Sequence, residues 1–305
     1  MKSVPAPDLS RVLSGPRREF DPPLAHCPLC GAAQIAAFLE DGRGISLWRC
    51  ARCRVGFMNP RYSDAALAEY YAGYATEAAM ESQALERRRL RKRASVARLA
   101  SAASRGRFLS VGAWDGLEVR LALEHGFEAE GFDVDPEATR RVSAEVGRPI
   151  HCGDFLDDGW LPRDVFPAGR PAAGYGYAAL MLDQVLEHPK QPGRYLARAA
   201  SLLAPGGVLY LGVPNLGSLS NRLKSLRDRA GLSSPRRRGK HFDSWQHLTY
   251  FCPASLAYGI REVAGLELST LAGEPDPQDG RLVARAKSLV PSLESTIYAL
   301  ARKRA

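Results

Sequence analysis

Four of the six cysteines form two Cys-x-x-Cys pairs, Cys27 with Cys30 and Cys50 with Cys53. Each pair can aim two thiolates at one ion through a tight turn, and the spacing between the pairs is typical of tetrahedral structural zinc sites. The sequence therefore predicts a closed zinc site made of four cysteines, with no position left open for catalysis. A redox pair, or a ribbon that has lost its metal, is the alternative.

A second chemical signal is the stretch FLSVGAWDGLEVRL, residues 108–121, which indicates a strand, a turn rich in glycine and a helix. Gly112 would let a ligand approach the backbone, and the following helix offers free N–H groups. Asp133 and Asp154 follow the next two strand-like segments, in GFDVDP and HCGDF. Because ligands bind beyond the carboxyl ends of parallel strands, we expect these residues to share one site.

The types of these residues favour an adenosine without phosphates. An acid that ends the second strand can accept hydrogen bonds from ribose hydroxyls, and one after the third can accept from an adenine amino group. The turn lacks the three glycines of a dinucleotide-binding loop, and the chain has no P-loop lysine at this turn. S-adenosylmethionine fits this pattern.

The motifs VGAWDG, GFDVDP, GDF, LEH and LLAPGGVLYLGVPN together resemble the class I S-adenosylmethionine-dependent methyltransferases. The preceding cysteine ribbon and the element HLTYF, residues 247–251, resemble a bacterial small-molecule branch of that family. The resemblance implies that the cofactor is bound by Gly112, Ala113, Asp115, Gly116, Asp133, Val134, Asp154, Phe155, Asp183 and Gln184. Two residues depart from the family pattern: Ser110 replaces an acid before the turn, and Trp114 replaces a glycine within it. A lapsed or altered site is therefore an alternative.

Two histidines are candidates for a general base, His188 in LEH and His247 after the basic segment. A structural role for His188 near the cofactor is the alternative. Relatives that methylate quinone-precursor phenols bind a divalent ion at Glu-x-x-Glu-His, and the matching residues here are Gln184, Glu187 and His188, with Asp183 adjacent. One carboxylate is missing from that set.

The net charge of +9 favours an anionic partner. Two basic segments, 87–93 and 221–240, are expected to be either solvated faces and a lid, or an anion site. We predict methylation, most simply of an oxygen, in a small acceptor such as a sugar, polyketide or quinone-like compound, which could be phosphorylated or nucleotide-linked. An RNA methyltransferase, a non-catalytic partner protein and contact with an acidic membrane surface are the alternatives.

Alternating strand-like and helix-like segments predict an α/β protein with a Rossmann-like, mostly parallel seven-stranded sheet whose last strand is antiparallel. The expected organisation is a disordered lead over 1–23, a zinc ribbon over 24–62, a helical linker over 63–104, the catalytic domain over 105–290 with a basic lid at 216–246, and a C-terminal helix over 291–305. The segment RLVARAK, 281–287, is expected to be a strand. No apolar run is long enough for a transmembrane helix, and a cytoplasmic protein is expected.

Overall fold

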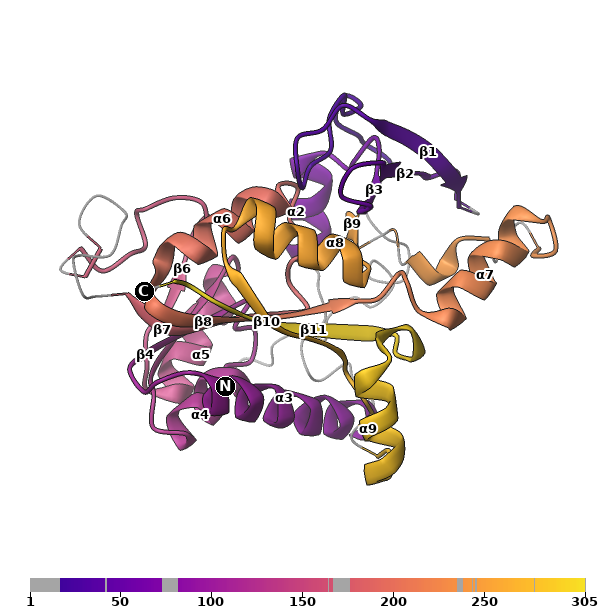
Figure 1. Cartoon of the computed structure of the whole chain (residues 1–305). Helices are drawn as coiled ribbons and strands as arrows, with labels where there is room; N and C mark the ends of the chain where they lie inside the picture. Colours follow the sequence, from indigo (N-terminus) through magenta and orange to yellow (C-terminus); the bar gives the residue numbers. More distant parts are fainter. Residues whose placement is uncertain are drawn as a thin grey trace.

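The protein is an α/β molecule in which a small ribbon sheet sits on a larger sheet covered by helices (Figure 1). The computed structural model describes residues 17–41, 43–72, 82–163, 165–166, 176–234, 238–242, 244, 246–276 and 278–304.

The larger sheet has seven strands in the order β10-β11-β8-β7-β4-β5-β6. Neighbouring strands from β8 to β6 run parallel, and β11 pairs antiparallel with both β8 and β10. The strands are β4 (Arg107–Val111), β5 (Glu128–Asp133), β6 (Ile150–Cys152), β7 (Tyr177–Asp183), β8 (Leu203–Pro214), β10 (Glu267–Gly273) and β11 (Thr296–Arg302). The predicted sheet is confirmed, and its central strands are apolar throughout because both faces are buried.

Helices cover both faces of this sheet. One hydrophobic cluster joins the sheet to α3 (Ser82–Ala102), α4 (Leu117–Glu124) and α5 (Pro136–Val146). The cluster on the opposite face includes residues of α6 (Pro192–Leu202), α8 (Pro253–Tyr258) and the π-helix η5 (Gly259–Val263). Figure 1 shows α3 and α4 below the sheet and α6 and α8 above it.

The ribbon sheet has the order β1-β2-β3-β9. Its first strands are β1 (Ile35–Glu40), β2 (Ser46–Cys50) and β3 (Gly56–Met58), and α2 (Asp64–Ala72) follows them. The fourth strand, β9 (Thr249–Tyr250), comes from the late HLTYF element and pairs antiparallel with β3. The ribbon cysteines also belong to the hydrophobic cluster that contains α6 and α8. The ribbon is thus packed against the larger domain and shares a sheet with it.

The last elements differ from the prediction. The C-terminal helix expected over 291–305 is wrong, because β11 occupies Thr296–Arg302 and lies inside the sheet between β8 and β10. The strand expected over 281–287 is also wrong, because α9 (Arg281–Leu289) and the short 3-10 helix η6 (Pro291–Leu293) occupy this region. Both errors concern short segments whose apolar pattern suits either conformation, so that the neighbouring strands decide.

Several expectations fall partly on residues that are not described; 73–81, within the expected helical linker over 63–104, are among these residues. Of the expected disordered lead over 1–23, residues 1–16 lie outside the described residues, but Phe20 forms a β-bridge with Tyr62 and stacks on its ring. The expected lid over 216–246 contains α7 (Leu219–Arg229) and the 3-10 helix η4 (Lys240–Phe242), while 235–237, 243 and 245 lie outside the described residues. No helix in the described part of the chain is both long and apolar enough to cross a bilayer.

Candidate functional site

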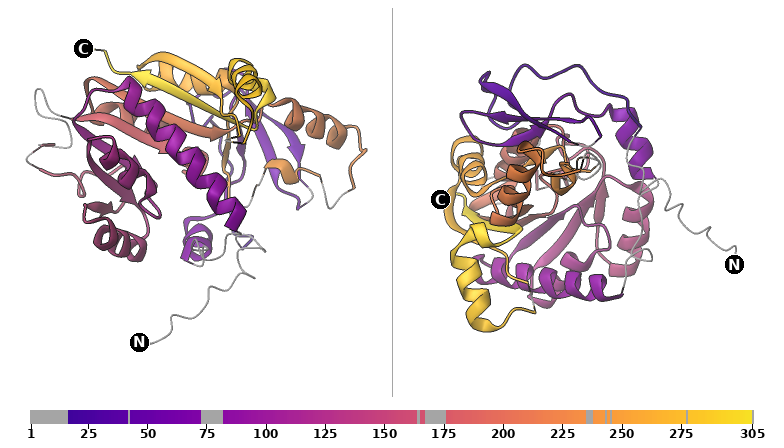
Figure 2. Two further views of the ribbon diagram at one scale, coloured as in Figure 1. Left: turned by 90° about the horizontal axis from the view of Figure 1, so that it is seen from below. Right: turned by 90° about the vertical axis from the view of Figure 1, so that its right-hand side faces the viewer.

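A cavity of about 890 Å³ opens at the carboxyl ends of β4, β5 and β7. Gly112, Asp133 and Asp183, which end or follow these strands, all line it. The N-terminal half of α3 and the segment around His247 also line it. The right-hand view of Figure 2 looks onto this edge of the sheet, from which α7 and α9 project. The fold therefore brings together the strand ends that the sequence predicts to form one site.

The turn after β4 is held in an unusual conformation. Gly112 has φ +73°, and a Cβ there would lie 2.7 Å from Val185 Cγ2. Trp114 also has a positive φ, 41°, and lines the cavity. The guanidinium of Arg88 lies 4.3 Å from the centre of its ring and forms two hydrogen bonds with the buried Asp115. The indole thus forms part of the cavity wall and is fixed there by α3.

Asp133 closes β5 and faces the cavity. Its carboxylate accepts hydrogen bonds from Trp114 N at 2.9 Å and from Asp135 N at 3.2 Å. Burial raises the pKa of Asp133, and the hydrogen bond from the Trp114 backbone opposes that shift. A carboxylate in this position can accept hydrogen bonds from hydroxyl groups of a ligand in the cavity.

A buried charged cluster lies at the carboxyl end of β7. Lys92 Nζ lies 2.6 Å from Glu118 Oε1 and 2.9 Å from Asp183 Oδ2. Burial alone would lower the pKa of Lys92, but its ion pairs with Asp183 and Glu118 outweigh burial and raise it. Asp183 Oδ1 is buried with no hydrogen-bond partner among the described residues. The cluster keeps a net negative charge and an unsatisfied acceptor, which suits a cationic group of a ligand.

The expected adenine side is aromatic. Phe132 and Val134 line the cavity, as does Tyr195, whose ring packs 5.1 Å from that of Phe155. Burial, followed by the nearby charge of Asp154, raises the pKa of Tyr195 to about 12. Asp154 itself is exposed and accepts a hydrogen bond from Leu156 N at 2.9 Å. An apolar, aromatic wall with a carboxylate near it suits a purine with an exocyclic amino group.

The two predicted histidines meet at the far side of the cavity. The rings of His188 and His247 lie edge to face with centroids 5.1 Å apart, and His188 Nδ1 hydrogen-bonds Gln246 O at 3.1 Å. One ligand atom each of Glu187, His188 and His247 lies within 4.8 Å of the others. Burial lowers the pKa of His247 to about 4 and raises that of Glu187 to about 8, with the charge of Asp183 adding to the rise. Both carboxylate oxygens of Glu187 lack a hydrogen-bond partner among the described residues.

The predicted residues do not all line the cavity. Gly112, Asp133, Val134, Asp183, Gln184, His188 and His247 line it. Ala113, Asp115, Gly116, Asp154 and Phe155 stand behind or beside the lining. Gly116, for example, touches α5, since a Cβ there would lie 2.5 Å from Val142 Cγ1. These residues adjoin the site without lining the cavity.

Sequence reasoning missed four cationic side chains that reach the cavity from α3. Arg87, Arg88, Arg91 and Lys92 line it, although they belong to a run that was expected to be a solvated face or an anion site. They recur at intervals of one and four residues, which places them along one side of the helix. That spacing was the available signal. The sequence alone does not indicate which side of α3 faces the sheet.

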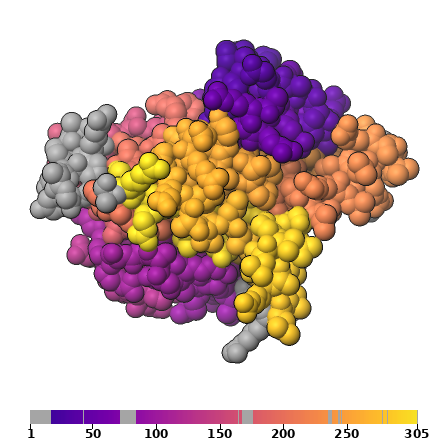
Figure 3. All heavy atoms as spheres, viewed as in Figure 1, coloured from indigo at the N-terminus to yellow at the C-terminus, as the bar shows by residue number. Residues whose placement is uncertain are grey.

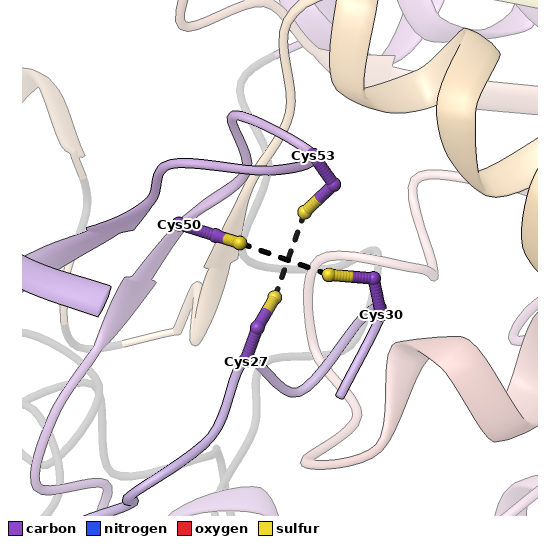
Figure 4. Close-up of side chains that lie close together, drawn as sticks. All are labelled: Cys27, Cys30, Cys50 and Cys53. Carbon is purple, nitrogen blue, oxygen red and sulfur yellow. Dashed lines mark hydrogen bonds between the residues drawn. The ribbon is translucent and has the colours of Figure 1, made fainter. Parts of the chain in front are cut away.

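The four paired cysteines converge in the ribbon (Figure 4). The Sγ atoms of Cys27 and Cys53 are 3.5 Å apart, those of Cys30 and Cys50 are 3.7 Å apart, and all four lie within 4.8 Å of one another. Sulfurs that surround zinc tetrahedrally at about 2.3 Å lie about 3.8 Å from each other. The arrangement is therefore compatible with zinc, and the donor set is the one a closed structural site requires.

Comparison with known proteins agrees with this geometry. A family model described as a methyltransferase domain matches residues 84–267, more than half of the chain. No curated protein matches the sequence. Many solved structures share the fold.

One similar structure is a chain of the complex between the Haloferax volcanii Trm112 methyltransferase activator and a protein described as a methyltransferase, with 16% identity, a TM-score of 0.50 and coverage of 73% of this chain and 93% of that one. A second is the 1,6-didemethyltoxoflavin-N1-methyltransferase of Burkholderia thailandensis, with 18% identity, a TM-score of 0.46 and coverage of 70% and 79%. At these identities the first likeness shows the fold alone, and the second carries no argument.

The matched region contains α3 from residue 84 onward, the cavity lining from Gly112 to His247 and the parallel part of the sheet. The strand order, with one antiparallel strand between β8 and β10, is that of the class I enzymes predicted from the motifs. The chain belongs to the methyltransferase-domain family and has the fold of the class I S-adenosylmethionine-dependent methyltransferases.

Proposed function

We propose that the protein transfers a methyl group from S-adenosylmethionine to an oxygen atom of a small acceptor. The observation that carries this proposal is that Glu187, His188 and His247 share one cavity with Gly112 and Asp133. The cofactor supplies an electrophilic methyl group on a sulfonium. The protein then has to hold two molecules in line and remove one proton.

The cofactor side of the proposal uses four residues. Gly112 lets the ligand approach the backbone, Asp133 accepts hydrogen bonds from the ribose, and Asp183 and Gln184 lie at the methionine end. The ion pair of Asp183 with Lys92 leaves one carboxylate oxygen without a partner among the described residues, which supports a role in binding an ammonium group. At the position of Ser110 the resemblance leads one to expect an acid, and Glu118 and Asp183 supply the negative charge in its place.

The acceptor side uses His247. Its depressed pKa keeps the imidazole neutral near pH 7, so that a ring nitrogen can take the proton of an acceptor hydroxyl as the new O–C bond forms. His188 is held beside it by its hydrogen bond to Gln246 O, and one Glu187 oxygen lies within 4.8 Å of a ring nitrogen of each histidine. Arg87 and Arg91 on the cavity wall favour an acceptor that carries an anionic group, such as a phosphate.

Two alternatives are less well supported. RNA recognition by the ribbon would need exposed aromatic rings, but Phe57 is buried and Trp48 packs against the core while its indole N–H donates to Ser46 Oγ. A divalent ion could bind Glu187, His188 and His247, but Asp183, the adjacent carboxylate that could complete the set, forms an ion pair with Lys92.

For the ribbon we propose that Cys27, Cys30, Cys50 and Cys53 hold one structural zinc.

Calorimetry tests the cofactor site directly. We expect S-adenosylhomocysteine to bind the intact protein, and Asp133→Ala to weaken binding by about tenfold or more because two ribose hydroxyls lose their acceptor. Asp135→Ser is the matched control. It removes a carboxylate two residues after Asp133 and keeps a side chain that can cap α5. Absence of binding by the intact protein would leave a non-catalytic partner protein as the better description.

Methyl transfer from labelled cofactor to a panel of phenolic, sugar and phosphorylated acceptors tests the chemistry. His247→Ala should lower kcat by about 10²-fold or more, as expected for loss of a general base, while cofactor affinity stays unchanged. Equal loss of cofactor affinity would mean that His247 binds the cofactor instead. Activity that requires an added divalent ion would favour the metal alternative, and methylation of RNA alone would overturn the choice of acceptor.

A further inference from the structure

The exposed apolar residues of the protein are concentrated in two segments. Of the eleven large hydrophobic side chains that are exposed in the described part of the chain, nine lie in residues 219–232 and 282–293. We call these nine the apolar rim: Leu219, Leu223, Leu226, Leu232, Leu282, Val283, Leu289, Val290 and Leu293. A concentration of exposed apolar side chains on one part of a protein surface marks an interaction site.

Helix α7 is oriented with its polar side inward. Its inward side chains make polar contacts: Asn221 Nδ2 donates to Asn215 O at 2.9 Å, Ser225 Oγ hydrogen-bonds His241 Nε2 at 2.8 Å, and the buried Asp228 accepts from Gly239 N at 2.8 Å. Leu219, Leu223 and Leu226 recur at intervals of four and three residues, and 53%, 62% and 65% of each is exposed. An amphipathic helix normally buries such a stripe. Here specific polar contacts hold the stripe toward the outside.

The second half of the rim adjoins the first. Leu282 and Leu289 are seven residues apart and lie on one side of α9, and Leu293 is the last residue of η6. Asn215, just before α7, donates to Pro291 O at 2.8 Å and to Glu294 O at 2.9 Å, which ties η6 to the start of α7. In the space-filling view the orange segment that contains α7 and the yellow segment that contains α9 project at the right and the lower right (Figure 3).

The rim lies at the edge of the sheet where the cavity opens. Helix α7 follows the carboxyl end of β8, and α9 follows that of β10 by way of Glu274, which lines the cavity. Arg87 on the cavity wall donates to Gln278 Oε1 at 3.3 Å, just before α9. Whatever covers the rim therefore lies next to the mouth of the cavity.

Basic side chains lie on the same two helices, α7 and α9, as the exposed leucines. Arg222, Lys224, Arg227 and Arg229 are exposed on α7, and Arg285 is exposed on α9. No ion pair with an acidic side chain is found for them among the described residues. The acids of this region are used elsewhere: Asp228 lies buried beside His241, while Asp279 and Glu294 bind Lys287. The rim is thus apolar and positively charged.

We propose that the apolar rim is a docking surface for an anionic lipid bilayer, with the leucines inserted at the level of the headgroups and the arginines on phosphates. Basic amphipathic helices bind membrane surfaces in this way. A second copy of the chain would bring two positively charged surfaces together, and a nucleic acid would leave the leucines in water. The inference concerns the surface beside the cavity and does not depend on the acceptor atom of the proposed reaction.

Flotation of the full chain with vesicles tests the proposal. We expect it to float with phosphatidylcholine vesicles that contain phosphatidylglycerol, and to remain in solution with phosphatidylcholine alone. The variant Leu223→Ser/Leu226→Ser should lower partitioning by about tenfold or more, and so should Arg222→Glu/Arg227→Glu. The control Arg140→Glu/Arg141→Glu makes the same change of charge on the exposed side of α5 and should float like the unaltered protein.

Unchanged binding of S-adenosylhomocysteine shows that each variant is folded, because the rim does not line the cofactor side of the cavity. Flotation that is absent in the unaltered protein, equal on neutral vesicles or insensitive to both rim variants would overturn the proposal. So would a dimer in sedimentation equilibrium that Leu223→Ser/Leu226→Ser abolishes, since the rim would then be an interface between copies.

Discussion

Arg88 and Asp115 form a two-point ion pair, with Nη1–Oδ2 at 2.5 Å and Nη2–Oδ1 at 3.0 Å. Asp115 belongs to the turn after β4, whereas Arg88 belongs to α3, which precedes that strand. The same guanidinium lies over the ring of Trp114. The turn after β4 carries Trp114 where a glycine was expected from the resemblance. It is held in place by α3, which lies outside the sequence motif of the turn.

Removing Arg88 should loosen this loop. Arg88→Ala leaves the buried carboxylate of Asp115 without its cation, and we expect the free energy of unfolding to fall by about 3 kcal/mol. Arg88→Ala/Asp115→Asn should recover part of that loss, because no uncompensated charge remains. Urea unfolding of the four members of this cycle measures the coupling. Strictly additive losses would mean that the pair does not hold the loop.

Gly112→Ala should impair cofactor binding more than folding. The new Cβ would lie 2.7 Å from Val185 Cγ2 at a backbone φ of +73°, so either the loop or Val185 has to move at the cavity wall. We expect affinity for S-adenosylhomocysteine to fall by about tenfold or more. Gly147→Ala is the matched control, with φ +67° and no atom within 4 Å of its Cβ. It should cost about 1 kcal/mol of stability and leave affinity unchanged.

The buried Glu187 should make stability depend on pH. Its pKa is raised to about 8 by burial, so between the ordinary carboxyl range and pH 8 the folded protein holds a proton that the unfolded chain has released. The free energy of unfolding therefore falls as pH rises through this window. Glu187→Gln mimics the protonated form and should be more stable than the unaltered protein at pH 8, with the difference vanishing toward pH 4.5. Thermal unfolding across this range gives the answer, and a difference independent of pH would contradict it.

Loss of the ribbon metal should destabilise the methyltransferase domain as well as the ribbon. Elemental analysis should find one zinc per chain, and Cys30→Ser should abolish it and lower the unfolding temperature, because the ribbon shares a hydrophobic cluster with the methyltransferase domain. Cys152→Ser is the control, since Cys152 is exposed and stands apart from the four ligands. A Cys30→Ser protein that melts like the control would mean that the site does not support the fold.

The local pattern of residues was sufficient to predict those elements whose conformation depends mainly on their own residues. The strands β4 to β8 were predictable because runs such as YAALMLD are apolar on both sides and are bounded by turn residues. The cysteine pairs were recognisable because each pair needs only its own turn. Asp133 was recognisable because a strand end places it at the sheet edge whatever the rest of the chain does.

Contacts between distant segments decided the rest. The segment TIYALAR becomes β11 because β8 and β10 leave a place between them, and its own propensity does not reveal that place. Arg88 and Lys92 reach the cavity only because α3 packs against the sheet on one particular side. Helix α7 turns its leucines outward because Ser225 and Asp228 find polar partners around His241 and Gly239. The sequence by itself determined the methyltransferase fold and the strand-end acids, since these follow from local pattern. The tertiary structure alone decided which cations brace the site and which leucines stay exposed, since those depend on partners far away along the chain.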